Sequence, residues 1–252
     1  MATRIVMWSS PRSASTALSR SFASREDAVI FDEPFYKYRL LSGGKCPNPE
    51  LREKVVASKW PSNYDEVTQM ITTDPMKDGA SVIYFKAPVS NVLVEDACSD
   101  RVASWITKVK NVFLTRHPAD VISSYEKYIH VDSPVDVGYP QQRFLYDEVR
   151  RLTGTPPPVF DTEDLLSHPR ETLQSLCHVV NIPFLESMLS WKATPRETDF
   201  PGSEPWYETV NNSTGFHAAP KQRILSKEQQ ALVEKILPTY EYLIEHKIRP
   251  DV

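Results

Sequence analysis

The segment from Trp8 to Thr16 combines hydroxyl side chains with one arginine. It reads Trp-Ser-Ser-Pro-Arg-Ser-Ala-Ser-Thr, with an apolar run before it and helical spacing after it. A helix N-terminus presents unpaired backbone N–H groups and a partial positive charge, so such a loop is suited to a phosphate or a sulfate. Arg12 would add a full charge, and Ser13 and Ser15 would add hydroxyl donors beside Thr16. The alternative is that these hydroxyls only cap the helix.

A second arginine stands at the end of a later strand. Arg116 follows an apolar run, and Ser124 lies eight residues further along, on the helix expected after that strand. Ligands of parallel α/β sheets bind outside the carboxyl ends of the strands. Arg116 should therefore face the same crevice as Arg12. The alternative is that Arg116 pairs with a surface carboxylate such as Asp120.

Two further strand ends carry ionisable side chains. The strand predicted over 28–31 ends at Asp32 and Glu33, and the strand predicted over 81–85 ends at Lys86. A carboxylate placed there can act as a general base, and a cation can stabilise charge on a leaving group. For the acidic pair, helix capping or a structural salt bridge is the alternative.

Strands and helices alternate along the chain, which predicts an α/β fold with a central parallel sheet flanked by helices. We expect a single domain over residues 1–252. The segment 192–222, which holds Trp206 and Tyr207, is polar and has few periodic signals, so we expect a functional role there. The predicted strands cover 4–8, 28–31, 81–85, 109–115 and 159–160. The predicted helices cover 13–24, 48–58, 64–72, a stretch from 117–118 onward, 139–152, 170–180 and 227–245.

The composition is that of an ordinary globular protein, with 40% hydrophobic and 25% charged residues. A formal net charge of −4 argues against a nucleic-acid partner, although local basic groups can still form a positive pocket. The N-terminus does not read as a signal peptide, and no apolar run is long enough to span a bilayer. The three cysteines are widely spaced without a CxxC pair. We therefore expect free thiols, no zinc site, no membrane partner and a cytoplasmic location.

Together these motifs resemble the PAPS-dependent sulfotransferases of the small-molecule type. That family uses 3′-phosphoadenosine-5′-phosphosulfate (PAPS) as donor, releases 3′-phosphoadenosine-5′-phosphate (PAP) and has a P-loop NTPase-like sulfotransferase fold. Its first loop is usually P-K/R-S-G-T/S-T, and residues 11–16 read Pro-Arg-Ser-Ala-Ser-Thr. The spacing of eight between Arg116 and Ser124 is similar to the family's 3′-phosphate motif, and residues 159–176 look like its later strand–loop–helix segment.

The resemblance implies which residues bind the donor. Arg116 and Ser124 would grip the 3′-phosphate, which distinguishes PAPS from ATP-like nucleotides. Ala14 stands where the family usually has glycine, so this backbone position must accommodate a Cβ. The first-loop residues that would hold the 5′-phosphosulfate are Arg12, Ser13, Ala14, Ser15 and Thr16. The late-loop residues that would close the donor site are Ser213, Thr214, Gly215 and Lys221.

The resemblance also implies catalytic roles. Arg12, and after it Lys86, would stabilise the charge that grows on the leaving 5′-phosphate. Some members of the broad family place a catalytic glutamate where Glu33 stands, so we expect Glu33 to be the base, with Asp32 in reserve. Many cytosolic members have a histidine two residues after the lysine, but this chain has Pro88, which cannot accept a proton. Three histidines stay open as the base: His117, His130 and His217.

The expected activity is sulfuryl transfer from PAPS to a hydroxyl, or an amine, of a small molecule without a metal. The acceptor would be bound by residues 35–75 and 128–145. One rival is a small-molecule kinase on a P-loop-like sheet, but the first loop lacks the Walker pattern of glycines followed by lysine. Another is a non-catalytic anion-binding module, which would have Glu33 and Lys86 pointing away from the donor. The sequence carries no signal for the oligomeric state.

Overall fold

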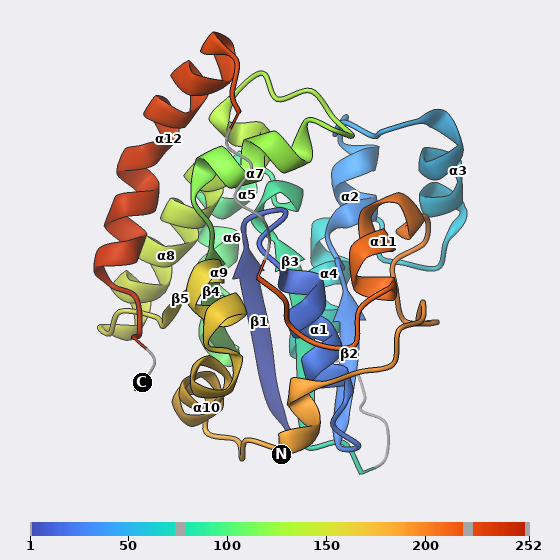
Figure 1. The fold of residues 1–252 in the computed structure, drawn as a ribbon, viewed down its shortest axis with the longest axis vertical. Coiled ribbons are helices and arrows are strands. Elements are labelled where there is room, and N and C mark those ends of the chain that lie inside the picture. The colour runs from blue at the N-terminus through green and yellow to red at the C-terminus, as the bar shows by residue number, and fades with distance from the viewer. Residues whose placement is uncertain (1, 74–78, 219–223, 250–252) are drawn as a thin grey trace.

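The computed structural model describes residues 2–73, 79–218 and 224–249 (Figure 1). Five strands form one parallel sheet in the spatial order β2-β3-β1-β4-β5, so the predicted α/β fold with a central parallel sheet is confirmed. Because all strands run the same way, their carboxyl ends meet at one edge of the sheet. The strands are β1 (Thr3–Ser9), β2 (Ala28–Asp32), β3 (Val82–Pro88), β4 (Lys110–Thr115) and β5 (Val159–Asp161).

Helices cover both faces of the sheet, and the central strand β1 is buried between them. Its side chains alternate, with Ile5 and Met7 on one face and Val6 and Trp8 on the other, all fully buried. The first face packs on α1 (Ser15–Ala23) and α10 (Pro169–Val180). The second packs on α4 (Tyr64–Thr72), α8 (Tyr139–Thr153) and the end of α12 (Lys227–Glu245).

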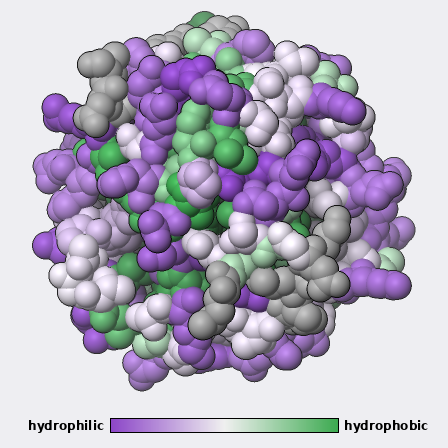
Figure 2. Space-filling view, turned by 90° about the horizontal axis from the view of Figure 1, so that it is seen from below, coloured by the Kyte–Doolittle hydropathy of each residue, from purple (hydrophilic) through white to green (hydrophobic). Residues whose placement is uncertain are grey.

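The predicted helices correspond to these five helices and to α3 (Pro49–Ala57) and α7 (Pro118–Tyr125). The ends agree to within a few residues, because each helix has a clear apolar stripe or a capping residue. On the face seen from below the view of Figure 1, hydrophilic residues cover much of the surface with apolar residues between them (Figure 2). The remaining helices are α2 (Tyr36–Leu41), α5 (Val94–Ala97), α6 (Asp100–Ala103), α9 (Thr162–Ser167) and α11 (Glu204–Asn211). Short 3-10 turns cover 89–91, 106–108, 134–137 and 186–189.

Strand β3 is longer than predicted, which changes the position of Lys86. The prediction ended the strand at this lysine, but the strand continues until Pro88, which pairs in register with Ser9. A proline at the last residue of a strand costs little, because few ladder bonds remain to be made there. Lys86 consequently lies within the sheet, directly beside Asp32 of β2.

Within its described part, the polar segment 192–222 contains a helix, α11, that periodicity did not predict. It has a proline in its first turn and buries only Tyr207 and Val210. Two buried apolar side chains in eight residues leave almost no helical pattern to detect. This helix lies beside the carboxyl ends of the strands, next to α1 and α2 in Figure 1.

Candidate functional site

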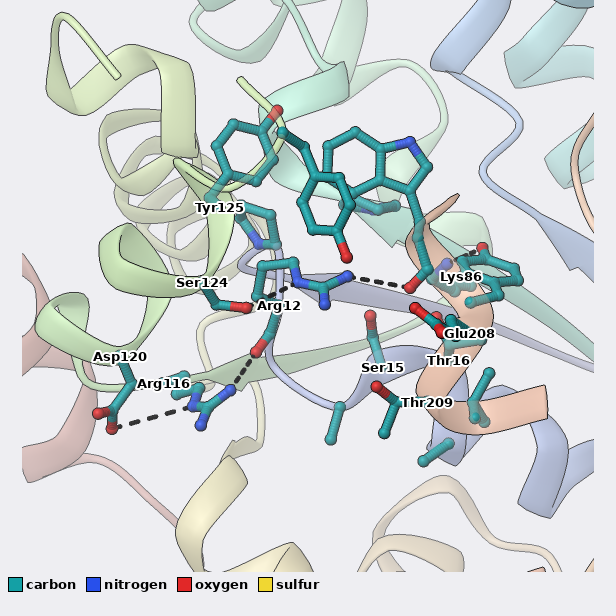
Figure 3. A pocket seen from close by; sticks show the side chains of 18 of the residues that line it. Arg12, Ser15, Thr16, Lys86, Arg116, Asp120, Ser124, Tyr125, Glu208 and Thr209 are labelled. Atoms are coloured by element: carbon teal, nitrogen blue, oxygen red, sulfur yellow. Dashed lines mark hydrogen bonds and ion pairs between the residues drawn. The ribbon is translucent and has the colours of Figure 1, made fainter. Parts of the chain in front are cut away.

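The carboxyl ends of the strands open into one cavity of about 890 Å³ (Figure 3). This volume is within the range of small-molecule sites. Its walls come from the segments that follow β1, β2, β3 and β4, and from α11 with the residues after it. Arg12 and Arg116 both line it, so the structure brings together the two arginines that the sequence analysis assigned to one crevice.

The loop after β1 leaves the N-terminus of α1 without a side-chain cap. Ala14 is the N-cap residue, so the alternative in which the hydroxyls only cap this helix does not hold. Ser15 and Thr16 line the cavity beside Ala14. Ser13 is fully buried, and its Oγ donates to the carbonyl of Ser10 at 2.6 Å. The open N–H groups and the Ser15 hydroxyl are therefore available to a ligand, whereas the Ser13 hydroxyl is engaged inside the loop and the Thr16 hydroxyl contacts that of Tyr207.

Three cavity-lining residues have a left-handed backbone although none is glycine. Their φ angles are 58° at Arg12, 60° at Ala14 and 52° at Glu33. This region costs an L-residue about 1–2 kcal/mol. Ala14 thus accommodates its Cβ at the position where the resembling family usually has glycine. Backbone strain of this kind concentrates at ligand and catalytic sites, where the surrounding structure holds it.

The Arg12 guanidinium makes no carboxylate contact within the described part of the chain. Its Nε donates to Ser124 Oγ and its Nη1 to the carbonyl of Trp206, both at 3.0 Å. Its charge lies 5.3 Å from the ring centre of Tyr128 and 5.9 Å from that of Trp206. Burial lowers the pKa of Arg12, because the charge loses water without gaining an opposite charge. A bound anion would supply that opposite charge.

Arg116 supports the first loop from the next strand. Its Nη1 donates to the carbonyl of Arg12 at 2.6 Å, and its Nε lies 3.9 Å from Asp120 Oδ2 (Figure 3). The pairing with Asp120 that the sequence left open is therefore present, at a long distance. Ser124, one turn beyond Asp120 on α7, lines the same cavity.

Lys86 lies at the centre of a buried ionic cluster at the cavity floor. Its side chain is 2% exposed, and its Nζ donates to Asp32 Oδ1 at 3.1 Å and to Glu33 Oε1 at 2.7 Å. The third acceptor is the hydroxyl of Tyr207. Asn91 Nδ2 donates to the other Glu33 oxygen at 2.9 Å. The salt bridge that the sequence left open as an alternative is therefore present. Glu33 and Lys86 nevertheless both line the cavity.

The electrostatics of this cluster keep Lys86 charged. Burial would lower the pKa of Lys86, but the carboxylates of Asp32 and Glu33 outweigh burial and raise it. Burial raises the pKa of Asp32, against the opposing effect of the Lys86 ammonium. A buried carboxyl of this kind takes up a proton more readily than an exposed one.

The histidines that stayed open as bases have separate positions. His117 Nδ1 accepts from the backbone N–H of Ala119 at 3.2 Å and so caps α7. His130 is exposed and lies 3.3 Å from Glu126 and from Asp132. His217 lines the cavity at its exposed rim.

The predicted late loop lies partly at the cavity. Ser213 and Gly215 line it, whereas Thr214 is exposed and its carbonyl accepts from the backbone N–H of Trp191 at 3.0 Å. Lys221 lies outside the described residues. The segments expected to bind the acceptor contribute the lining residues Tyr36, Tyr128 and Ile129.

Several cavity residues carry no sequence motif that predicts a site. Tyr207 and Trp206 stand out only as aromatic residues in an unpatterned segment, and Asn91 and Tyr125 carry no signal of their own. An aromatic pair within a polar stretch was the one available signal, because such side chains need a partner surface. These side chains contact residues of β2, β3 and the first loop, and contacts between such distant segments leave no pattern in the local sequence.

None of the helices in the described residues combines the length and the apolar character that crossing a bilayer requires. Over the same ranges, no group of three or more His, Cys, Asp or Glu side chains is arranged to hold a metal ion.

Comparisons with known proteins agree with this architecture. Two Arabidopsis thaliana proteins, branched-chain-amino-acid aminotransferase-like proteins 1 and 2, are 33% identical over 244 residues and 34% identical over 237 residues. The matches cover 95% and 94% of this chain but 41% and 40% of those proteins, so the chain spans about two fifths of their length.

A solved sulfotransferase from Alicyclobacillus acidocaldarius has the same fold, with a TM-score of 0.53 over 98% of each chain at 10% identity. The model of the sulfotransferase domain family matches residues 3–246, nearly the whole chain. A family match that covers nearly the whole chain is sufficient to assign the chain to that family. This chain belongs to the sulfotransferase domain family.

Proposed function

We propose that this chain transfers a sulfuryl group from PAPS to a hydroxyl, or an amine, of a small-molecule acceptor and releases PAP. The supporting observation is that Arg12 and Arg116, from the ends of neighbouring strands, line one cavity. PAPS carries anionic groups at its 3′ and 5′ ends, so two cations in one cleft match its charge pattern. The family name alone would not select this donor.

The residues of the first loop fit the 5′-phosphosulfate. The uncapped N-terminus of α1 offers backbone N–H groups, and Ser15 and Thr16 add hydroxyls at the cavity wall. Arg116 and Ser124 would hold the 3′-phosphate. Ser213 and Gly215 at the rim would contact the nucleotide from the opposite side.

Arg12 and Lys86 have different capacities to stabilise the leaving group. A guanidinium has five N–H donors, and the contacts described for Arg12 use two. The three protons of the Lys86 ammonium are all engaged within the protein. In this proposal Arg12 stabilises the developing charge on the 5′-phosphate, whereas Lys86 holds Glu33, which takes the acceptor proton.

The rival functions find less support. A non-catalytic module would have Glu33 and Lys86 pointing away from the cavity, but both line it. A kinase would need the Walker glycines and lysine that the loop lacks. The aminotransferase-like name belongs to proteins of which this chain matches about two fifths. We keep the cytoplasm as the proposed location because the three cysteines are free thiols.

Thermal unfolding with different nucleotides tests the donor. PAP at a hundredfold excess over its Kd should stabilise the protein by about 2.7 kcal/mol, while AMP and ATP with Mg²⁺ should stabilise it less. Arg12→Ala should remove most of the PAP effect, and Arg151→Ala, on the exposed surface of α8, should retain it. A larger effect of ATP with Mg²⁺ than of PAP would favour the kinase instead.

A further inference from the structure

Tyr207 connects the two carboxylates at the cavity floor. Its hydroxyl donates to Asp32 Oδ2 at 2.7 Å, and the same oxygen lies 3.3 Å from Glu33 Oε1. That oxygen also accepts from Lys86 Nζ. Tyr207 is 2% exposed and comes from α11, whereas the other three residues come from the ends of β2 and β3. We call Asp32, Glu33, Lys86 and Tyr207 the carboxylate cluster.

The carboxylate cluster has a net charge of −1 when both carboxyl groups are ionised, because one ammonium faces two carboxylates. Asp32 and Lys86 are almost fully buried, and the Glu33 side chain is 12% exposed. An uncompensated charge is costly in such surroundings. One additional proton makes the cluster neutral, so the unit as a whole is poised to accept a single proton.

Within the cluster, Asp32 is the favoured place for that proton. Asp32 is further from the cavity than Glu33, which lines it, and burial raises the pKa of Asp32. Burial also raises the pKa of Tyr207 well above its usual value, so its hydroxyl stays protonated. Such a hydroxyl can pass a proton on only by accepting one on its oxygen while giving up its own.

We propose that the carboxylate cluster acts as one shared base, in which Tyr207 conducts the proton from Glu33 to Asp32. The inference rests on the proposed function for the source of the proton. The acceptor O–H bond breaks as a Glu33 O–H bond forms. The Glu33 O–H bond then breaks as Tyr207 oxygen accepts the proton, and the original Tyr207 O–H bond breaks as Asp32 Oδ2–H forms. The acceptor oxygen keeps its electron pair for attack on sulfur.

Other polar groups face the carboxylate cluster from each neighbouring element. They do not bridge Asp32 and Glu33 as Tyr207 does, so removal of the Tyr207 hydroxyl is the substitution that tests the bridge. Asn91 holds Glu33 Oε2, and the backbone N–H of Phe200 donates to Asp32 Oδ2 at 3.0 Å. The titratable and polar groups around the cluster are Arg12, Thr16, Arg20, Tyr36, Tyr84, Asn91 and Tyr125.

The first test is the titration of the Asp32 carboxyl carbon by NMR in the unliganded protein. In Tyr207→Phe, which keeps the ring, the Asp32 signal should move to higher pH because its carboxylate loses a donor. In Glu33→Gln the Asp32 signal should move to lower pH, because the neighbouring negative charge is removed. An Asp32 midpoint that neither variant changes would overturn the proposal.

The second test is kinetic, with PAPS as donor and water as the probe acceptor, followed by PAP release. Tyr207→Phe should lower kcat about tenfold or more at the pH plateau, a fraction of what general-base catalysis contributes, and leave KM for PAPS within about twofold. The acid limb of the kcat profile should move to higher pH. A plateau kcat equal to that of the wild type would contradict a proton-conducting role.

Tyr146→Phe is the matched control. It removes a hydroxyl on α8 that is buried and has no hydrogen-bond partner in the described structure, and Tyr146 neither lines the cavity nor has a residue of the carboxylate cluster among its electrostatic neighbours. Its Asp32 titration and pH profile should be those of the wild type. If the proposed function is wrong, PAP will not stabilise the wild-type protein. The carboxyl titration needs no PAP or PAPS, so it tests the carboxylate cluster independently of that result.

Discussion

Two cations beside the cavity differ in what surrounds them. Lys86 faces two carboxylates and a phenol, so its charge is already satisfied. Arg12 faces a hydroxyl, a backbone carbonyl and two aromatic rings, all of them uncharged. Because charge without a counter-charge attracts an anionic ligand most strongly, Arg12 is better suited to bind one than Lys86 is.

Arg116→Ala should weaken PAP binding by about 1.5–3 kcal/mol, the usual size of a charge-assisted contact. This corresponds to roughly 10- to 150-fold in Kd, measurable by isothermal titration calorimetry. The loop should also lose support, because Arg116 Nη1 holds the carbonyl of Arg12. Arg151→Ala serves as the control on an exposed surface. Unchanged PAP affinity would remove Arg116 from the donor site.

Among the secondary-structure elements, α11 contacts both the first loop, at Arg12, and strand β3, at Lys86. The carbonyl of Trp206 accepts from Arg12, and the hydroxyl of Tyr207 meets Lys86. The segment before α11 is fastened to α1 by a buried, two-pronged pair of Arg20 and Asp199, with O···N distances of 2.5 and 2.6 Å. Polar and ionic contacts thus position this helix together with its two buried apolar side chains, Tyr207 and Val210.

Asp199→Asn should lower the free energy of unfolding by about 3–5 kcal/mol. The Arg20 guanidinium would stay buried, at 3% exposure of its side chain, without an opposite charge. Urea denaturation monitored by tryptophan fluorescence measures this. Asp132→Asn, which removes an exposed partner of Lys45, should cost no more than about 1 kcal/mol. Equal, small losses in both variants would mean that Arg20 finds a substitute partner.

The elements that the sequence predicted best are those with strong local patterns. β1 and the helix at 227–245 were placed to within one residue because alternation or an apolar stripe marks them. α11 was missed, and β3 was drawn three residues short, because a helix with two buried side chains and a strand ending in proline carry no such pattern. Both of these weakly patterned elements contribute to the cavity wall.

For the molecule as a whole, charge is distributed unevenly. The chain has a formal net charge of −4, yet Arg12 and Arg116 line one cavity. A cation in direct reach of a ligand acts on it more strongly than a modest net charge spread over the molecule, which salt screens at longer range. An acidic protein can thus offer an anion site. The three cysteines lie in different environments, since Cys98 is exposed, Cys46 is half-buried and Cys177 is in the core.

Cys177 should not react with 5,5′-dithiobis(2-nitrobenzoate) in the folded protein. It is 1% exposed, and burial raises its pKa to about 11, so little thiolate forms and the reagent has no access. Cys98, which is exposed, should react first, and all three thiols should react in guanidinium chloride. Cys98→Ser should remove the fast phase. Reaction of three thiols without denaturant would show that the packing around α10 opens.

Local patterns in the chain suffice to predict the α/β fold, the order of its strands and the strand ends that carry Arg12, Glu33 and Arg116. They suffice because strand and helix periodicity is local, and because parallel strands bring their carboxyl ends to one edge. The inward turn of Ser13, and the contact of Tyr207 with Lys86 from 121 residues away, emerge only from the folded arrangement. Contacts between such distant residues depend on how the elements pack, which no local pattern encodes.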